Sequence, residues 1–198
     1  MHIVVLTEKP FSATAKEAIT RAVKATPHSV TFAERCAPDR VCDAVSTADA
    51  LVVRSDRVTA DIVDAAPNLK LVVRAGAGYD TIDLAACSAR GVVVMNTPGQ
   101  NAEAVAEMAI LLVLFAFRNM LHPGVGREMQ GKTIGVCGYG HVGRLVAERA
   151  RGFGMRVVTY DPAVKSPDMA AGLDELFSKC DVVSLNMPLT PETRRVIT

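Results

Sequence analysis

The sequence lacks tryptophan, and aromatic residues make up only 5% of its 198 residues. It also lacks an excess of either charge, since 22 Lys and Arg residues are balanced by 21 Asp and Glu residues. No block of basic residues occurs. Nucleic acids and membrane surfaces are recognised by clustered positive charge, so we expect neither as a partner.

Cysteine is present, but in no metal-binding or disulfide pattern. The five cysteines are odd in number and scattered, and no Cys-x-x-Cys pair occurs. Such usage argues against a zinc site or a disulfide framework and favours reduced, mostly buried thiols. We therefore expect a cytoplasmic protein without a metal.

Long apolar runs are also missing. The most apolar run, MAILLVLFAF at Met108–Phe117, has ten residues, whereas a membrane-spanning helix needs about 20. We interpret it as a helix that is buried in a core or at a subunit contact. The N-terminus, MHIVVLTEKP, has no basic segment followed by a long apolar one, so it predicts a first strand and not a signal peptide.

Short runs rich in Val and Ile alternate with helix-like runs in the first half of the chain. Strands are predicted at 2–7, 29–34, 50–55, 69–76 and 92–97. Helices are predicted at 12–25 with Ser12 as N-cap, 37–48, 59–67 with Thr59 as cap, and 82–91, closed by Gly91. Apolar strands that alternate with helices indicate a parallel sheet covered by helices.

The alternation stops at Pro98 and Gly99 and then restarts. The second half predicts a long helix at 101–120, a Pro- and Gly-rich connector at 121–131, strands at 132–138, 155–161 and 181–188, and helices at 141–154 and 172–180. The chain thus divides into two α/β units, 1–97 and 98–198. A doubly wound dinucleotide domain has about six strands, so we expect the second unit to be an incomplete one.

A glycine-spaced loop follows the predicted strand at 132–138. Gly138, Gly140 and Gly143 form the pattern G-x-G-x-x-G, and a predicted helix begins at about His141. Between a strand and a helix, this spacing predicts a dinucleotide site. Gly138 permits the tight turn, Gly140 lets the backbone approach a pyrophosphate, and Gly143 lets the helix pack closely. Free N–H groups and the positive end of the helix dipole attract the phosphates.

An acidic residue ends the next predicted strand. Asp161 lies 18 positions after Gly143, where a carboxylate can accept hydrogen bonds from the adenosine ribose. It would repel the 2′-phosphate of NADP, so the sequence favours NAD as cofactor. The alternative is that Asp161 only starts a turn with Pro162. His141 is a candidate catalytic residue by its type, but its place at the helix start favours a solvent-facing residue beside the phosphates.

Three segments in order carry a resemblance to a known family. They are VVRSDRVTADIVDAAPNLKLVVRAGAGYDTIDLAACSARGVVVMNTPGQNAEAVAEMAILLVLFAFRNM, GKTIGVCGYGHVGRLVAERARGFGMRVVTYDP and CDVVSLNMPLTPETRRVI. From about Ala50 to Thr198 the chain resembles the D-isomer-specific 2-hydroxyacid dehydrogenases, and among them the 3-phosphoglycerate dehydrogenases. The first fifty residues resemble them in pattern only.

The resemblance implies a flavodoxin-like substrate domain followed by an incomplete Rossmann NAD-binding domain, with a small 2-hydroxy or 2-oxo acid bound between them. It implies oxidation of 3-phosphoglycerate, as in serine biosynthesis, and a homodimer. The residues matching the family's cofactor site are Tyr139, Gly140, His141, Val142 and Gly143 in the pyrophosphate loop, Asp161 with Pro162 at the ribose, and Met187, Pro188 and Thr193 beside the adenosine.

The loop RAGAGYD, residues 74–80, resembles the family's substrate-carboxylate loop. Its matching residues are Arg74, Ala75, Gly76, Ala77 and Gly78. The backbone N–H groups of Ala75, Gly76 and Ala77 would bind the carboxylate, and small side chains leave such amides open. The alternative is an ordinary turn from strand to helix.

Two further residues match substrate positions of the family. Arg54 matches an arginine that holds the substrate phosphate, and an arginine at the end of a strand faces the ligand crevice of such sheets. Its alternative is a surface ion pair. Asn101 matches a position near the substrate, and it is also suited to cap the long helix.

The sequence departs from the family in places. The connector at 121–131, which normally helps to form the dimer contact, is shorter than its family counterpart. Asn186 stands where a histidine is common, and Ala77 lacks a hydroxyl often found there. We expect these differences to bear on oligomeric state and cofactor affinity.

The family transfers hydride between its substrate's C2 and NAD with a histidine acid/base, a glutamate that orients it and an arginine on the substrate carboxylate. All three motifs lie beyond the matched segments. We therefore expect these 198 residues to show no significant turnover alone, as part of a longer enzyme. The alternative is a non-catalytic NAD-binding or interaction module of the same family.

Overall fold

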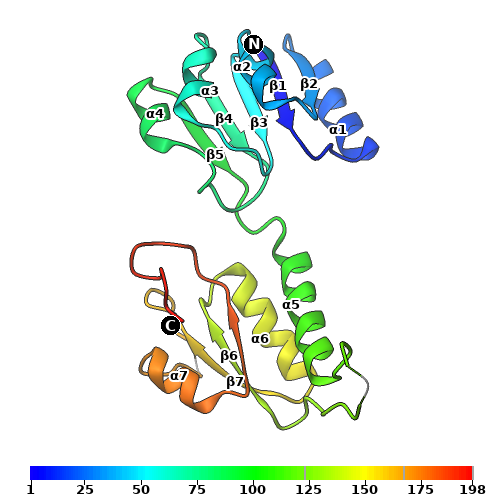
Figure 1. Cartoon of the computed structure of the whole chain (residues 1–198), viewed down its shortest axis with the longest axis vertical. Helices are drawn as coiled ribbons and strands as arrows, with labels where there is room; N and C mark the ends of the chain where they lie inside the picture. The colour runs from blue at the N-terminus through cyan, green and yellow to red at the C-terminus, as the bar shows by residue number, and fades with distance from the viewer. Residues whose placement is uncertain (123, 167, 198) are drawn as a thin grey trace. The chain divides into compact units, whose positions relative to one another are not determined.

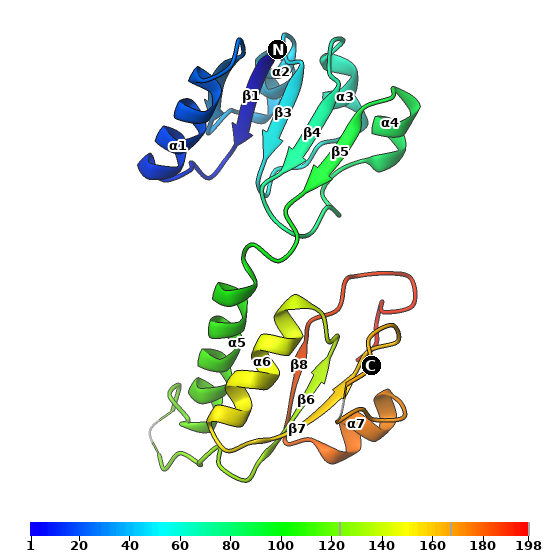
Figure 2. The ribbon, with the colours of Figure 1, turned by 180° about the vertical axis from the view of Figure 1, so that it is seen from behind.

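A computed structural model describes residues 1–122, 124–166 and 168–197; Pro123, within the predicted connector, lies outside them. The chain forms two compact units, Met1–Pro98 and Gly99–Thr198, each with its own sheet (Figures 1 and 2). The predicted strands and helices are present, and most of them begin and end within a few residues of the expected positions.

The sheet of the first unit has five parallel strands. They are β1 (His2–Thr7), β2 (Ser29–Glu34), β3 (Ala50–Val53), β4 (Leu71–Arg74) and β5 (Val93–Asn96). Their order in the sheet is β2-β1-β3-β4-β5. This is the flavodoxin-like order, in which the direction of progression reverses between β1 and β3. The predicted fold class of this unit is confirmed.

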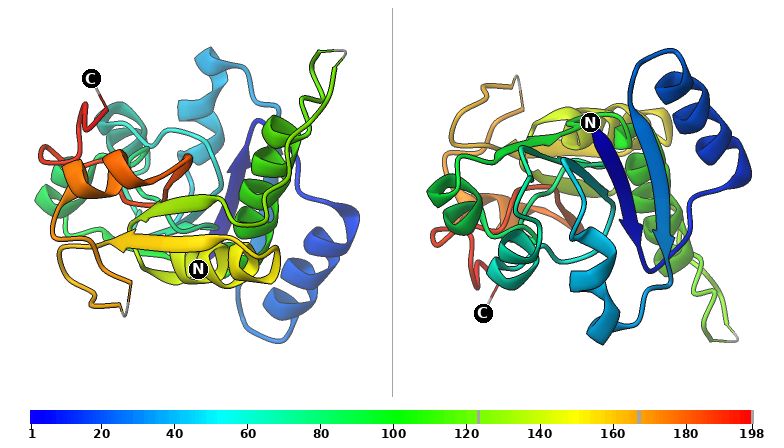
Figure 3. Two further views of the ribbon diagram at one scale, coloured as in Figure 1. Left: turned by 90° about the horizontal axis from the view of Figure 1, so that it is seen from below. Right: turned by 90° about the horizontal axis from the view of Figure 1, so that it is seen from above.

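Four α-helices connect these strands. They are α1 (Ala13–Lys24), α2 (Val41–Val45), α3 (Ala60–Ala65) and α4 (Leu84–Ala89). Right-handed crossovers place α1 on one side of the sheet and the other three on the opposite side, as the view from above in Figure 3 shows. The predicted helix at 37–48 is shorter than expected, because Pro38–Arg40 form a 3-10 turn before α2.

The capping hydrogen bonds expected at the helix ends are present only in part. The Ser12 hydroxyl accepts a hydrogen bond from the Ala15 N–H at 3.2 Å, as expected of an N-cap. Thr59 occupies the N-cap position of α3, but its side chain makes no capping bond in the described structure. The Asp83 side chain accepts a hydrogen bond from the Ala86 N–H at 2.9 Å and caps α4, and Gly91 adopts φ +67° just after that helix, as expected of the residue that closes it.

The sheet of the second unit has three parallel strands in the described residues. They are β6 (Thr133–Cys137), β7 (Arg156–Tyr160) and β8 (Val182–Leu185), in the order β7-β6-β8. The chain moves from β6 to β7 on one side and then returns to β8 on the other. The carboxyl ends of β6 and β8 therefore form a topological switch point, where α/β sheets bind ligands.

Three α-helices of the described residues pack around this sheet. They are α5 (Ala102–Phe117), α6 (His141–Gly152) and α7 (Leu173–Lys179). Helices α5 and α6 lie side by side in Figures 1 and 2, and an ion pair between Glu103 and Arg149 joins them. The central strand β6 is completely buried, so its carboxyl end is held rigidly at the switch point.

Helix α5 is buried on one face only. Ala106, Ile110 and Val113 pack into the core, whereas Met108 and Leu112 on the other face are 54% and 60% exposed. One face of the Met108–Phe117 run thus lies in the core, as expected, and the subunit contact that was expected as the alternative stays a prediction for the exposed face. In the described part of the chain, every helix is too short or too polar to cross a membrane, and His, Cys, Asp and Glu residues form no metal-binding cluster.

Candidate functional site

The glycine turn begins where β6 ends. Gly138 adopts φ +85°, and its N–H donates a hydrogen bond to the Tyr160 carbonyl oxygen at 2.8 Å. A Cβ atom at this position would lie 2.8 Å from the backbone of Asn186. Both the backbone conformation and the lack of space thus require glycine, as the sequence predicted for the tight turn.

The other two glycines of the motif differ in their surroundings. Gly140 is the exposed N-cap of α6, and a Cβ atom on it would meet no described atom within 4 Å. Gly143 is buried, and a Cβ atom on it would overlap the Gly138 carbonyl oxygen. The first therefore leaves open space beside the positive end of a helix, and the second lets the helix contact the turn.

Asp161 holds the glycine turn from the next strand. Its Oδ2 atom accepts a hydrogen bond from the Tyr139 N–H at 2.7 Å, and its Oδ1 atom accepts from the N–H groups of Ala163 and Val164 at 2.8 and 2.9 Å. The carboxylate thus starts a turn at Pro162 and also braces the glycine loop. A carboxylate has about four acceptor sites, so three bonds leave capacity for a further donor.

The Asp161 carboxylate is stabilised in its ionised form. Burial alone raises its pKa, but the hydrogen bonds from Tyr139, Ala163 and Val164 and the charge of Arg144 outweigh burial. The net result is a pKa below the ordinary aspartate value. A negative charge therefore stands at the end of β7, two residues beyond the buried Thr159.

Arg144 is a residue of this site that the sequence analysis missed. Its Nε atom donates to the Tyr139 carbonyl oxygen at 3.1 Å, and its guanidinium lies 5.7 Å from the centre of the Tyr139 ring. It is exposed on the first turn of α6. The glycine pattern does not require an arginine after Gly143. The only signal in the sequence was the position of Arg144, one residue after the motif.

Other residues predicted for the cofactor lie around the turn. His141 is exposed at the start of α6, beside Gly99, while Val142 is half-buried against the core of this unit. The exposed position of His141 agrees with the expected solvent-facing residue.

The loop after β8 lies directly against the glycine turn. The Asn186 N–H donates to the Cys137 carbonyl oxygen at 2.7 Å, and the next residue, Met187, packs on the small core around Cys137. The Thr193 hydroxyl donates to the Pro188 carbonyl oxygen at 2.7 Å. That hydroxyl therefore organises the loop internally, in addition to any role it has toward a nucleotide.

A groove of about 650 Å³ runs between α5 and β8. Asn101 and Asn186 are among its polar lining residues, and Met108, Leu112 and Val183 are among its apolar ones. Asn101 occupies the N-cap position of α5, yet its side chain makes no capping bond to the described residues. Of the two roles expected for Asn101, helix capping by the side chain is therefore absent.

In the first unit, the predicted substrate residues lie at the carboxyl edge of the sheet. Arg54 directly follows β3, Arg74 is the last residue of β4, and Asn96, which the sequence analysis did not predict, is the last residue of β5. Arg74 is aligned with Val53 on one side and with Asn96 on the other. The parallel register thus brings these three polar residues to neighbouring strand ends, where open α/β sheets bind ligands.

The RAGAGYD loop has fewer open amides than the sequence suggested. The Ala75 N–H donates to the Val53 carbonyl oxygen and the Gly76 N–H to the Arg74 carbonyl oxygen, both at 2.8 Å. These two groups are engaged within the fold. The N–H groups of Ala77 and Gly78 donate to no atom in the described part of the chain. Of the three amides expected to bind a carboxylate, only that of Ala77 is therefore open, and the Gly78 amide is open beside it.

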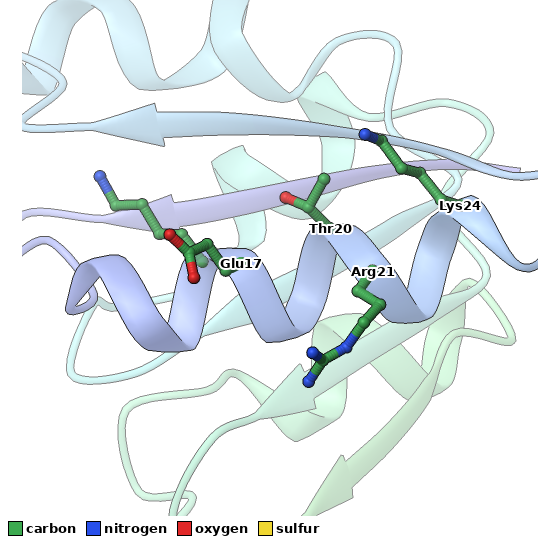
Figure 4. A pocket seen from close by; sticks show the side chains of 5 residues that line it. Glu17, Thr20, Arg21 and Lys24 are labelled. Carbon is green, nitrogen blue, oxygen red and sulfur yellow. The ribbon is translucent and has the colours of Figure 1, made fainter.

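Another hollow of the first unit lies on the surface of α1 and contains none of the predicted site residues. Figure 4 shows Glu17, Thr20, Arg21 and Lys24 around it. Lys16, which also lines it, is paired with Glu34 of β2 at 2.5 Å. The hollow is a charged helix surface, and we assign no site to it.

The comparison with family models agrees with this geometry. The model of the D-isomer specific 2-hydroxyacid dehydrogenase catalytic domain matches residues 4–197. The chain belongs to this family. The resemblance inferred from the three sequence segments is therefore confirmed.

Relatives within the 2-hydroxyacid dehydrogenase family are longer than this chain. A hydroxypyruvate reductase of Thermotoga maritima is 40% identical over 181 residues, which cover 83% of this chain and 59% of the relative. A D-3-phosphoglycerate dehydrogenase of Mycobacterium tuberculosis is 43% identical over 180 residues, which cover 80% of this chain and 34% of the relative. The chain thus spans between about a third and three fifths of these curated relatives.

Solved structures of the family share the fold. NAD⁺-bound 3-phosphoglycerate dehydrogenase of Entamoeba histolytica is 44% identical with a TM-score of 0.94, covering 98% of this chain and 64% of that one. An NAD-dependent formate dehydrogenase of Staphylococcus aureus, in complex with NAD, is 28% identical with a TM-score of 0.85, covering 99% and 68%. NAD is thus the cofactor in both structures, in agreement with the cofactor predicted from the sequence.

Proposed function

We propose that this chain is the ligand-recognition part of an NAD-dependent 2-hydroxyacid dehydrogenase, with NAD on residues 98–198 and the acid substrate on residues 1–97. The observation that carries this proposal is the glycine turn at the switch point of the second sheet. Open space at Gly140, the start of α6 and the ionised Asp161 together suit a pyrophosphate followed by a ribose.

The charge at Asp161 supports NAD over NADP. Its carboxylate has acceptor capacity for the adenosine ribose hydroxyls. A 2′-phosphate in the same place would meet a carboxylate whose pKa is held low by three backbone N–H groups. Like charges this close disfavour binding, so we propose that the chain discriminates against NADP.

The first unit supports a phosphorylated 2-hydroxy acid as substrate. Arg54 is exposed at the end of β3, which suits a phosphate, while Ala77 and Gly78 offer N–H groups for a carboxylate. We propose 3-phosphoglycerate, because relatives above 40% identity are named for it.

Bound NAD would supply the hydride acceptor for oxidation at the substrate's C2. The residues described here bind and orient the two ligands, and Asp161 holds the adenosine half of the cofactor in position. Proton transfer at the substrate hydroxyl needs an acid/base group, which the resemblance places beyond the matched segments. We therefore propose that the 198 residues bind both ligands without significant turnover.

A non-catalytic NAD-binding or interaction module is the second candidate. The exposed apolar face of α5, with Met108, Leu111 and Leu112, favours it, because a contiguous apolar surface marks an interaction site. The same face suits a second copy of the chain, and we propose a homodimer. Sedimentation of the purified chain measures this state, and a monomer at all concentrations would contradict the dimer.

A matched pair of glycine substitutions tests the cofactor site. Gly140 and Gly152 lie at opposite ends of α6, neither has a positive φ, and a Cβ atom on either meets no described atom within 4 Å. We expect Gly140→Ala to weaken NADH binding by about tenfold or more, by blocking the backbone approach. Gly152→Ala should bind like the parent chain. Equal binding by both variants would contradict the proposed site.

A further inference from the structure

The RAGAGYD loop is attached to the end of β5 by two hydrogen bonds. The Thr97 N–H donates to the Gly76 carbonyl oxygen at 3.0 Å. The Asn96 side chain donates through Nδ2 to the Ala77 carbonyl oxygen at 2.6 Å. Two successive carbonyl groups of the loop therefore point toward the end of β5.

This attachment determines where the loop's open amides point. In a planar trans peptide, the N–H points opposite to the preceding C=O. Because the Gly76 carbonyl faces Thr97, the Ala77 N–H points away from β5. Because the Ala77 carbonyl faces Asn96, the Gly78 N–H points away as well. Two adjacent N–H groups that point the same way form an anion-binding nest.

A positive charge accompanies the two amides. A Cβ atom on Gly76 would overlap the Arg74 guanidinium, so that group lies directly over the Gly76 backbone. The Arg74 Nε atom is buried and has no hydrogen-bond partner among the described residues. An unpaired buried donor is costly, and a bound anion would supply an acceptor near it.

The last residue of this loop, Asp80, is acidic. Asp80 Oδ1 is 3.0 Å from where a Cβ atom on Gly78 would be. It accepts no hydrogen bond from Ala77 or Gly78 in the described structure. The carboxylate therefore leaves both amides open, and its charge limits the affinity for an anion.

We infer that Asn96 is a positioning residue, which orients the Ala77 and Gly78 N–H groups toward the carboxylate of a 2-hydroxy acid. It acts through the Ala77 peptide group and does not touch the ligand. The inference rests on the proposed function, because it takes the loop as the carboxylate site. It adds that the specificity of this loop depends on a side chain outside the RAGAGYD motif.

The experiment follows the backbone amides of the full 198-residue chain by NMR during titration with D-glycerate. D-Glycerate is a 2-hydroxy acid without a phosphate, so Arg54 contributes least to its binding. We expect saturable amide shifts at Ala77 and Gly78 in the parent chain. Asn96→Leu, which keeps the branched shape and removes the donor, should weaken binding about tenfold and reduce these shifts.

Asn68→Ala is the matched control, since Asn68 is exposed in the same unit, before β4. It should bind D-glycerate like the parent. Thermal unfolding of each variant reports folding separately, and Asn96→Ala serves as a second variant if Asn96→Leu melts early. Parent-like affinity and shifts in a folded Asn96 variant would overturn the inference.

NADH binding to the same samples separates the two proposals. Shifts at Ala77 and Gly78 that depend on Asn96, without NADH binding, support the inference and contradict the proposed cofactor role. NADH binding without any shift at Ala77 and Gly78 overturns the inference and leaves the cofactor role standing.

Discussion

The Asp161 carboxylate accepts a hydrogen bond from the Tyr139 N–H at 2.7 Å, so the end of β7 braces the glycine turn that follows β6. The carboxylate that is expected to bind the ribose hydroxyls therefore also stabilises the conformation of the phosphate loop. Substitutions at Asp161 will therefore change both the free energy of unfolding and the affinity for the cofactor. Measuring stability as a function of pH reports the first effect separately.

The first prediction concerns stability and pH. The pKa of Asp161 in the folded chain is lowered, so its stabilising contribution is complete above the ordinary Asp pKa of about 3.9 and is lost as pH falls through the lower folded value. We expect Asp161→Asn to cost about 1 kcal/mol at pH 7. Chemical denaturation should show that difference shrinking as pH falls below about 4. A difference that does not change with pH would count against this prediction.

The second prediction concerns the packing of α6 on the turn. A Cβ atom on Gly143 would overlap the Gly138 carbonyl oxygen, and backbone cannot yield as a side chain can. We expect Gly143→Ala to lower the free energy of unfolding by about 3 kcal/mol. The matched change Gly152→Ala should leave it unchanged or slightly raised, because alanine favours a helix. Urea denaturation measures both, and equal stability of the two variants would contradict the close contact.

The third prediction separates phosphate from carboxylate recognition. Arg54 stands at the end of β3, apart from the amides of Ala77 and Gly78 in sequence and strand position. Arg54→Ala should weaken binding of 3-phosphoglycerate about tenfold or more, since a charged hydrogen bond is lost. Binding of D-glycerate should change little. Calorimetric titration with both acids tests this, and equal loss for both would place Arg54 at the carboxylate instead.

The fourth prediction concerns thiol reactivity. Burial, with a smaller effect from the neighbouring Cys180, raises the pKa of Cys137 to about 11. Thiolate is the reactive form, so Cys137 should resist a disulfide reagent at pH 8 in the folded chain. Cys42 is exposed and should be modified first. Peptide mapping after brief labelling measures the order, and early labelling of Cys137 would show that the core around it opens.

Much of the fold is predictable because its signals are local. Val- and Ile-rich runs and the capping residue Ser12 determine where β1 and α1 lie, and the observed β1 matches the predicted residues. The strand order is not local. The position of β8 beside β6, and not beside β7, comes from the crossover path that the sequence pattern does not contain.

The candidate site likewise has features that local sequence predicts and features that depend on the fold. Gly138 and Gly143 have the conformations and contacts expected of them, because the motif itself sets the turn. The partners of the Ala75 and Gly76 amides are carbonyl groups brought close by the fold. The small residues of the loop therefore predicted more free N–H donors than the loop has. Arg144 and Asn96 were missed because their roles come from what they contact and not from a motif.

The central claim is that the second unit binds NAD at the glycine turn and rejects NADP through Asp161. Calorimetric titration of the purified chain with NADH and with NADPH tests it most directly. We predict saturable binding of NADH, at least about tenfold tighter than NADPH, with the preference lost in Asp161→Ser. Equal affinity for the two nucleotides, or binding of neither, would contradict the account.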